Sequence, residues 1–98
     1  MIMRIFRAVV HEGQQEAFQE FFLETALPLV RSQEGLISAQ VGLPEEDSPE
    51  EFSMLMLWKD LESLKKFTGE EWHEAVILPD EFHLVKEVFV HHYEVADV

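Results

Sequence analysis

The segment that most constrains the fold is residues 51–58, where both faces of a predicted strand are largely apolar. Alternate side chains of a strand point to opposite faces of its sheet. One face carries Phe52, Met54, Met56 and Trp58, and the other carries Ser53, Leu55, Leu57 and Lys59. A strand shows this pattern when something covers the sheet on each side. The fold must therefore provide cover for two faces.

The spacing of the apolar residues changes to a helical period directly after this strand. Asp60 is suited to cap the helix that follows, and the pair Thr68-Gly69 is suited to end it. Residues 70–78 are expected to add a further turn or two of helix, closed by Pro79.

The order of the predicted elements defines the fold class. They are a strand at 2–10, helical sequence at about 14–33, strands at 36–43 and 51–58, the helical segments just described, and a strand at 83–95. Pro28 should kink or break the first helical segment, and residues 44–50 form an acidic loop. This order predicts an α+β ferredoxin-like fold, the split βαβ arrangement βαββαβ, with helices on one face of a four-stranded antiparallel sheet.

A sheet of this kind leaves one face without helices, which predicts a homodimer. Residues 1–98 have room for one hydrophobic core, so a single domain is expected. Its strands nevertheless carry large apolar side chains on both faces. If the second face were exposed to solvent, roughly several hundred Å2 of apolar surface would be in contact with water. A second copy of the chain packed sheet to sheet covers that face most simply.

Charge and composition exclude several classes of partner. The formal net charge of −13 at pH 7 repels phosphate backbones and anionic lipids, so neither nucleic acid nor a membrane is expected as a partner. No apolar run approaches the roughly 20 residues of a membrane span, and no signal-peptide pattern opens the sequence, which favours a cytoplasmic protein. The absence of cysteine removes disulfides and thiolate ligands. The spacing Glu70-x-x-His73 is half of a carboxylate-bridged metal site at best, so no metal is expected.

The chain resembles the antibiotic biosynthesis monooxygenase (ABM) domain family over essentially its whole length. The resemblance lies in the pair Glu34-Gly35 at the end of the first helix, the run W-K-D-L-E-S-L from Trp58 to Leu64, and a histidine on the next segment. It implies a dimeric α/β barrel with a pocket in each subunit between sheet and helices. Members of this family oxidise polycyclic phenols with O2 and no cofactor, degrade haem, or isomerise or decarboxylate small molecules, and many have no known activity.

The haem-degrading branch relies on an asparagine, a tryptophan and a histidine. Trp58 matches the tryptophan and His73 is a candidate for the histidine, but the chain contains no asparagine. We therefore expect haem not to be the natural cofactor, and we expect no cofactor at all.

The cofactor-free phenol oxidisers need a base and polar groups that hold the resulting anion. His73 is the candidate base, because an imidazole titrates near neutral pH, and Trp58 is the second candidate catalytic residue. Arg4 or Arg7 can hold the anion, although the two lie on opposite faces of one strand. The remaining candidate substrate-binding residues are Tyr93, Trp72 and His91.

Each candidate also has a purely structural interpretation, and two classes of function remain open. Trp58 and Trp72 can simply fill the core, and His73 can be a solvated residue among glutamates. The first class is a cofactor-free monooxygenase for an aromatic or polyketide-like molecule, favoured by a pocket that joins His73, Tyr93 and one arginine. The second is a non-catalytic homodimer that binds a small apolar ligand or a partner, favoured by a cavity filled with Trp and Met side chains.

Overall fold

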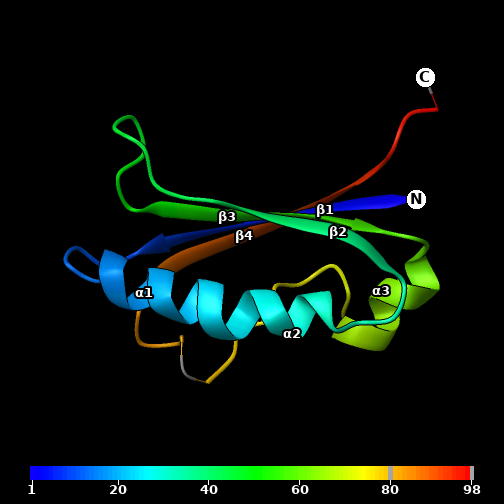
Figure 1. The fold of residues 1–98 in the computed structure, drawn as a ribbon, viewed down its shortest axis with the longest axis horizontal. Coiled ribbons are helices and arrows are strands. Elements are labelled where there is room, and N and C mark those ends of the chain that lie inside the picture. The colour runs from blue at the N-terminus through cyan, green and yellow to red at the C-terminus, as the bar shows by residue number, and fades with distance from the viewer. Residues whose placement is uncertain (80, 98) are drawn as a thin grey trace.

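The computed structural model describes residues 1–79 and 81–97 and has the predicted ferredoxin-like fold (Figure 1). Its elements are β1 (Ile2–Val10), α1 (Gln15–Phe21), the π-helical segment η1 (Phe22–Ala26), α2 (Leu27–Arg31), β2 (Leu36–Gly42), β3 (Glu51–Trp58), α3 (Leu61–Thr68) and β4 (Val85–Glu94). The strands form one antiparallel sheet in the order β2-β3-β1-β4. All helical segments lie on one side of this sheet, and the other side is open (Figure 1).

The first helix passes through Pro28 without breaking. The predicted effect of Pro28 is a kink or a break. The five residues directly before the α2 segment form a π-helical stretch, and α1, η1 and α2 run on from one another in Figure 1. Proline has no N–H to donate to the carbonyl four residues earlier, and its ring crowds that carbonyl. A local widening of the helix relieves this conflict while the apolar stripe stays on the sheet.

The core lies between the sheet and the helices, as the strand pattern predicts. Alternate residues of β1 and β3 are buried toward the helices, among them Arg4, Phe6, Ala8, Val10, Phe52, Met54, Met56 and Trp58. Phe18 and Phe22 of the first helix meet Phe52 of β3 in a cluster of tilted rings, with centroids 4.9 Å apart for the closest pairs. These large rings position the helix over β3 and β1.

The start of α3 is fixed by two local interactions. The Asp60 Oδ1 atom accepts a hydrogen bond of 2.8 Å from the backbone N–H of Ser63, which confirms the predicted cap. Gly35 has φ of +89° and lies so close to α3 that a Cβ atom there would overlap the Ser63 side chain. Only glycine allows both this backbone conformation and this approach.

The prediction of helix at residues 70–78 is wrong. After Gly69 the described residues before β4 form turns and irregular backbone, and we call residues 69–79 and 81–84 the connecting loop. The Arg4 side chain donates hydrogen bonds to the carbonyl oxygens of Trp72 and Glu74, at 2.6 and 3.1 Å. A tertiary contact thus satisfies backbone groups that would otherwise need a helix, and it overrides the local helical pattern.

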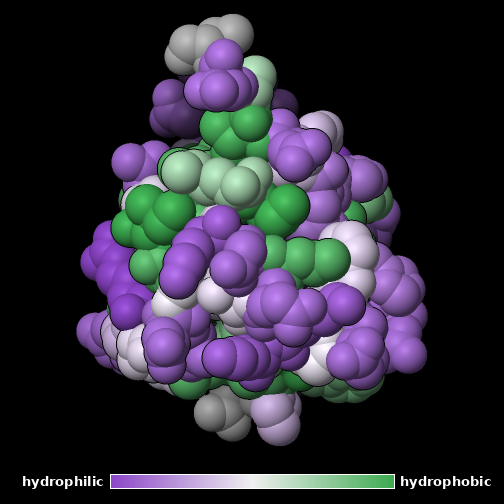
Figure 2. Space-filling view, turned by 90° about the vertical axis from the view of Figure 1, so that its right-hand side faces the viewer, coloured by the Kyte–Doolittle hydropathy of each residue, from purple (hydrophilic) through white to green (hydrophobic). Residues whose placement is uncertain are grey.

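The open face of the sheet carries the other set of strand side chains. They include Met3, Ile5 and Arg7 of β1, Leu55 and Leu57 of β3, and Phe89, His91 and Tyr93 of β4. Figure 2 shows apolar side chains gathered in its upper half, on the side of the molecule away from the helices. None of the helices among residues 1–79 and 81–97 is long and apolar enough to span a bilayer.

Trp58 should be among the most costly core residues to truncate. Its side chain is fully buried and stacks on Phe67, with ring centroids 5.6 Å apart. We expect Trp58→Ala to lower the free energy of unfolding by roughly 3–5 kcal/mol, measured by urea denaturation. Phe82→Ala removes an aromatic ring that is 72% exposed and serves as the control. Equal losses in both variants would contradict the packing described here.

Candidate functional site

A small apolar cavity lies between the sheet and the helices. Its volume is about 50 Å3, and it is open to solvent on one side. The lining residues come from the sheet (Arg4, Phe6, Met54, Met56), the helices (Phe22, Ala26, Leu29, Val30, Phe67) and the connecting loop (Val76, Leu78, Glu81). Ten of these twelve side chains are apolar, so the two charged ones stand out as the groups that could orient a ligand.

Arg4 is the cationic group of the cavity and is only 2% exposed. Its position on the helix-facing side of β1 follows from strand alternation, since Phe6 and Ala8 point the same way. Besides its bonds to the two loop carbonyls, its Nη1 atom lies 2.7 Å from the His92 Nε2 atom. Burial lowers the pKa of the guanidinium to about 10, so Arg4 is still positively charged at neutral pH.

His92 completes the support of Arg4 from the neighbouring strand. It is directly opposite Arg4 in the β1–β4 register, and its ring meets the Trp72 ring edge to face with centroids 4.9 Å apart. An arginine can only donate, so Nε2 accepts and the imidazole is neutral with its proton on Nδ1. Burial, followed by the charge of Arg4, lowers the pKa of His92 to about 4.

Glu81 is the anionic group of the cavity and is only 3% exposed. Its Oε1 atom accepts a 2.9 Å hydrogen bond from the backbone N–H of Leu78, which closes a turn in the connecting loop. Burial raises the pKa of this carboxyl group above its usual value, and the Leu78 hydrogen bond opposes that rise more weakly.

The structure brings together two of the seven candidate site residues and separates the rest. Arg4 lines the cavity, and Trp72 supports it through its carbonyl oxygen. The side chains on the open sheet face point away from the cavity, and they are Arg7, His91 and Tyr93. Arg7 there forms an ion pair of 3.5 Å with Glu51 and lies over the Phe89 ring. The expectation that at most one arginine reaches the pocket agrees with this geometry.

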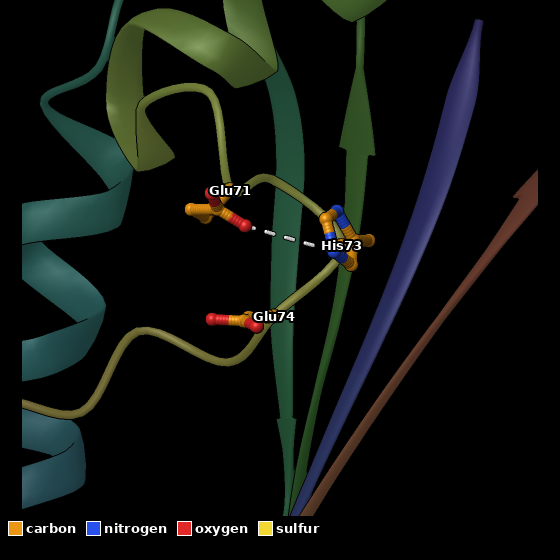
Figure 3. A group of neighbouring side chains, drawn as sticks. All are labelled: Glu71, His73 and Glu74. Carbon is orange, nitrogen blue, oxygen red and sulfur yellow. Dashed lines mark ion pairs between the residues drawn. The ribbon is translucent and has the colours of Figure 1, made fainter.

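Trp58 and His73, the candidate catalytic residues, do not line the cavity. Trp58 lies behind Phe67, which does line it, and the indole Nε1 atom is buried with no hydrogen-bond partner among the described residues. The His73 side chain is 61% exposed and lies 3.8 Å from the Glu71 carboxylate, as Figure 3 shows. The catalytic roles of both residues stay predictions.

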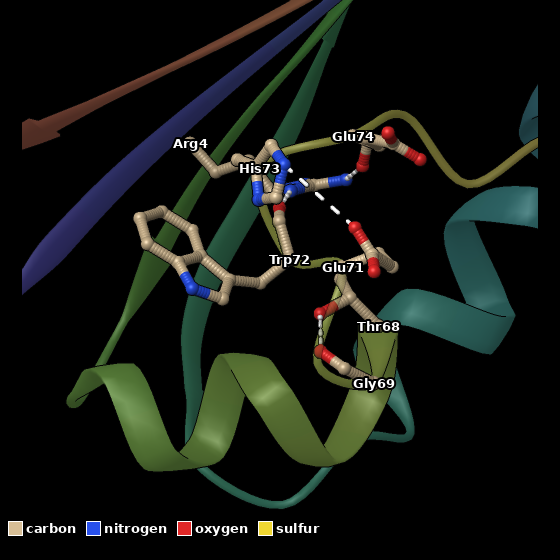
Figure 4. A network of polar contacts seen from close by, with 7 residues as sticks. All are labelled: Arg4, Thr68, Gly69, Glu71, Trp72, His73 and Glu74. Carbon is tan, nitrogen blue, oxygen red and sulfur yellow. Dashed lines mark hydrogen bonds and ion pairs between the residues drawn. The ribbon is translucent and has the colours of Figure 1, made fainter.

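The acidic group around His73 has the composition of a cation site but no further support. The ligand atoms of Glu71, His73 and Glu74 lie within 4.8 Å of one another, and all three side chains are exposed. Figure 4 shows that Arg4 reaches the same short segment from the sheet side. The segment is therefore held by its backbone carbonyls, and its carboxylates remain free to be solvated.

Sequence reasoning missed Glu81 and His92. Glu81 lies between the predicted helical turns and the last predicted strand, where no periodicity marks its side chain as buried. His92 shares a strand face with Val88 and Val90, which is a weak sign of burial. Its pairing with Arg4 depends on the strand order, because β1 and β4 lie side by side only in the folded sheet.

Comparison with known proteins identifies the class. The model of the antibiotic biosynthesis monooxygenase family, ABM, matches residues 1–77, and the chain belongs to this family. No curated protein matches the chain.

Three solved structures illustrate the shared fold. A suggested antibiotic biosynthesis monooxygenase from Deinococcus radiodurans is 14% identical, with a TM-score of 0.79 over 100% of this chain and 95% of that chain. SnoaB, a cofactor-independent oxygenase from Streptomyces nogalater, is 18% identical, with a TM-score of 0.73 over 99% and 94%. Protein SO0527 from Shewanella oneidensis is 20% identical, with a TM-score of 0.72 over 94% and 87%. At these identities the likeness establishes the fold alone.

The support that His92 gives to Arg4 should appear in the pH dependence of stability. The unfolded chain takes up a proton at His92 near the ordinary histidine pKa of 6.5, whereas the folded protein does so only near a pKa of about 4. Stability from this site is therefore present above about pH 6.5 and is lost as the pH falls toward 4. His92→Gln keeps an acceptor for Arg4 but does not titrate, so its free energy of unfolding should fall less steeply over this range.

Urea denaturation at several pH values measures this difference. His11→Gln, in an exposed turn, controls for the general loss of an imidazole. The contribution of Glu81 has the opposite sign but is common to all three proteins. Parallel curves for the wild-type protein and His92→Gln would refute the role given to His92.

Proposed function

We propose that this protein is a cofactor-independent monooxygenase that acts on an aromatic or polyketide-like molecule bound between the sheet and the helices. The observation that carries the proposal is the buried, positively charged Arg4 in the wall of an otherwise apolar cavity. Membership of the ABM family and the similarity in fold to SnoaB support the same reaction class.

The proposed chemistry begins with the loss of a proton from a hydroxyl group on the ring. The resulting anion is electron-rich enough to reduce O2, so the protein must stabilise the anion and position it. A guanidinium in an apolar wall serves this purpose well, because its attraction for an anion is stronger there than in water. Arg4 is held by the connecting loop and His92, so it is already in place before the substrate binds.

The second candidate is a non-catalytic homodimer that binds a small apolar ligand. The apolar wall of the cavity favours it in part, because Met54 and Met56 line the cavity together with three phenylalanines, whereas neither tryptophan does. Neither His73 nor Tyr93 lines the cavity, so the group expected of the oxygenase is incomplete. Both candidates share the ligand site and differ in whether O2 is consumed.

Oxygen uptake tests the choice between the two. We expect the purified protein, without added metal or cofactor, to consume O2 with a hydroxylated aromatic compound. The corresponding methyl ether should be inert, because it has no proton to lose. An oxygen electrode measures both rates. If the hydroxylated compound binds but no O2 is consumed, the oxygenase is wrong and the binding module is favoured.

We propose in addition that the protein is a homodimer joined through the open sheet face. That face carries apolar side chains along three strands, including Ile5 at its centre, Leu55 opposite it on β3, and Tyr93, which is 53% exposed. Two charged side chains of this face, Arg7 and Glu51, form an ion pair within the chain. A self-complementary apolar face is suited to a two-fold symmetric partner.

Sedimentation equilibrium at micromolar concentration tests the dimer. We expect about twice the chain mass of 11.5 kDa for the wild-type protein. Leu55→Arg places a charge in the middle of the open face and should give a monomer. Gln19→Arg places the same charge on the exposed side of α1 and should remain dimeric. A monomeric wild-type protein would contradict this assembly.

A further inference from the structure

The cavity contains a buried cation, Arg4, and a buried carboxyl group, Glu81, that do not pair with each other. Arg4 and Glu81 are the two buried charged residues among those that the structure describes, and both line the same cavity. The ion pairs within residues 1–79 and 81–97 are Arg7–Glu51 and His73–Glu71, so Arg4 and Glu81 are not within contact distance. Buried charges are costly unless something compensates them. A molecule that bridges the two groups would provide that compensation.

We propose that Glu81 accepts the proton of a ring hydroxyl while Arg4 holds an oxygen of the same molecule that is conjugated with it. The ligand is therefore a single-ring phenol or enol that also carries a carbonyl group. The inference rests on the proposed function in one respect, that the cavity is the substrate site.

The position of Glu81 suits a proton acceptor. Its Oε1 atom is fixed by the N–H of Leu78, and within the described part of the chain its second oxygen makes no hydrogen bond to protein. The side chains around it, such as Val76 and Leu78, are apolar and offer the carboxylate no competing hydrogen bond. Burial makes this carboxylate more basic than an exposed one, as the direction of its pKa shift shows.

The position of Arg4 suits the other end of the ligand. The bonds to Trp72, Glu74 and His92 use three of the five N–H groups of its guanidinium, and the side chain still lines the cavity. A conjugated carbonyl oxygen gains negative charge when the hydroxyl at the other end of the ring ionises. The cation then lies where the charge develops, which is the arrangement that lowers the energy of the anion.

The size of the cavity limits the ligand to one ring. Its volume of about 50 Å3 is smaller than the roughly 150 Å3 of an engineered cavity that binds benzene, so even one ring must extend into the open side of the cavity. A polycyclic molecule would enter with one ring only, unless the connecting loop moved away from the sheet.

The proton transfer is balanced without any further reactant. The O–H bond of the ligand breaks, its electron pair stays on the ligand oxygen, and the proton forms a bond with a carboxylate oxygen of Glu81. No electron leaves the ligand in this step. Reaction with O2 would follow as a separate event, so ionisation can be measured without it.

The test uses 4-hydroxybenzaldehyde, whose neutral and ionised forms absorb at different wavelengths. At a pH where the free probe is mostly neutral, we expect binding to the wild-type protein to raise its ionised fraction. In Glu81→Gln the ionised form of the bound probe should appear roughly 100-fold more slowly after mixing, measured by stopped-flow absorbance, because no carboxylate is there to take the proton. Glutamine keeps the size of the side chain and an oxygen for the Leu78 N–H, and Glu62→Gln, on the exposed side of α3, is the matched control.

Two further arms keep the test decisive. Binding of 4-methoxybenzaldehyde, measured by equilibrium dialysis, reports whether a variant still has the cavity, because this probe cannot ionise. If Glu81→Gln fails to bind the ether, Glu81→Asp replaces it: this variant should bind the ether and ionise the phenol more slowly than the wild type, because its shorter carboxylate lies further from the hydroxyl.

The inference is overturned if the wild-type protein does not bind or ionise the phenol, or if Glu81→Gln ionises it as fast as the wild type. It is also overturned if the loss occurs in His73→Ala, the base expected from the sequence. The outcome is independent of the oxygenase proposal. A protein that ionises the probe through Glu81 but consumes no O2 would support the site and refute the oxygenase.

Discussion

The wall of the cavity depends on the hydrogen bonds of Arg4. One buried side chain on β1 binds the carbonyl oxygens of Trp72 and Glu74, and it is supported by His92 on β4. The described residues of the connecting loop contain no helix or strand, so these hydrogen bonds fix the loop against the sheet. The loop in turn supplies Val76, Leu78 and Glu81 to the cavity wall. Burying the charge of Arg4 without partners would be destabilising. Here the same side chain holds the loop in place and provides the cation of the cavity.

The two faces of the sheet carry different groups of functional residues. The face toward the helices holds the aromatic core and the cavity, and strand alternation places Arg4 there. The open face holds Arg7, His91 and Tyr93, which lie on the wrong side of the sheet to meet a ligand in the same chain's cavity. Residues that are close in sequence can therefore belong to different surfaces, because neighbours on a strand point in opposite directions.

The cavity combines low polarity with two fixed charges. Apolar walls weaken the competition from water, so a cation and a carboxylate act over a short range with more energy than at the surface. The same burial makes His92 a neutral acceptor and makes the Glu81 carboxyl a weaker acid. Each shift has burial as its largest cause, so the closure of the loop over the sheet sets the chemistry of all three groups.

The sequence alone determined the strands, the capped helix after Trp58 and the ferredoxin-like order, because these depend on local periodicity and on caps such as Asp60. It also identified Arg4 as one of two arginines that could reach a pocket. Only the tertiary structure decided that residues 70–78 are not helical, that His73 is exposed, and that Glu81 and His92 belong to the site. The physical reason is that these outcomes depend on contacts between β1, β4 and the loop. Such contacts join residues that are 68 to 88 positions apart, and no local pattern records them.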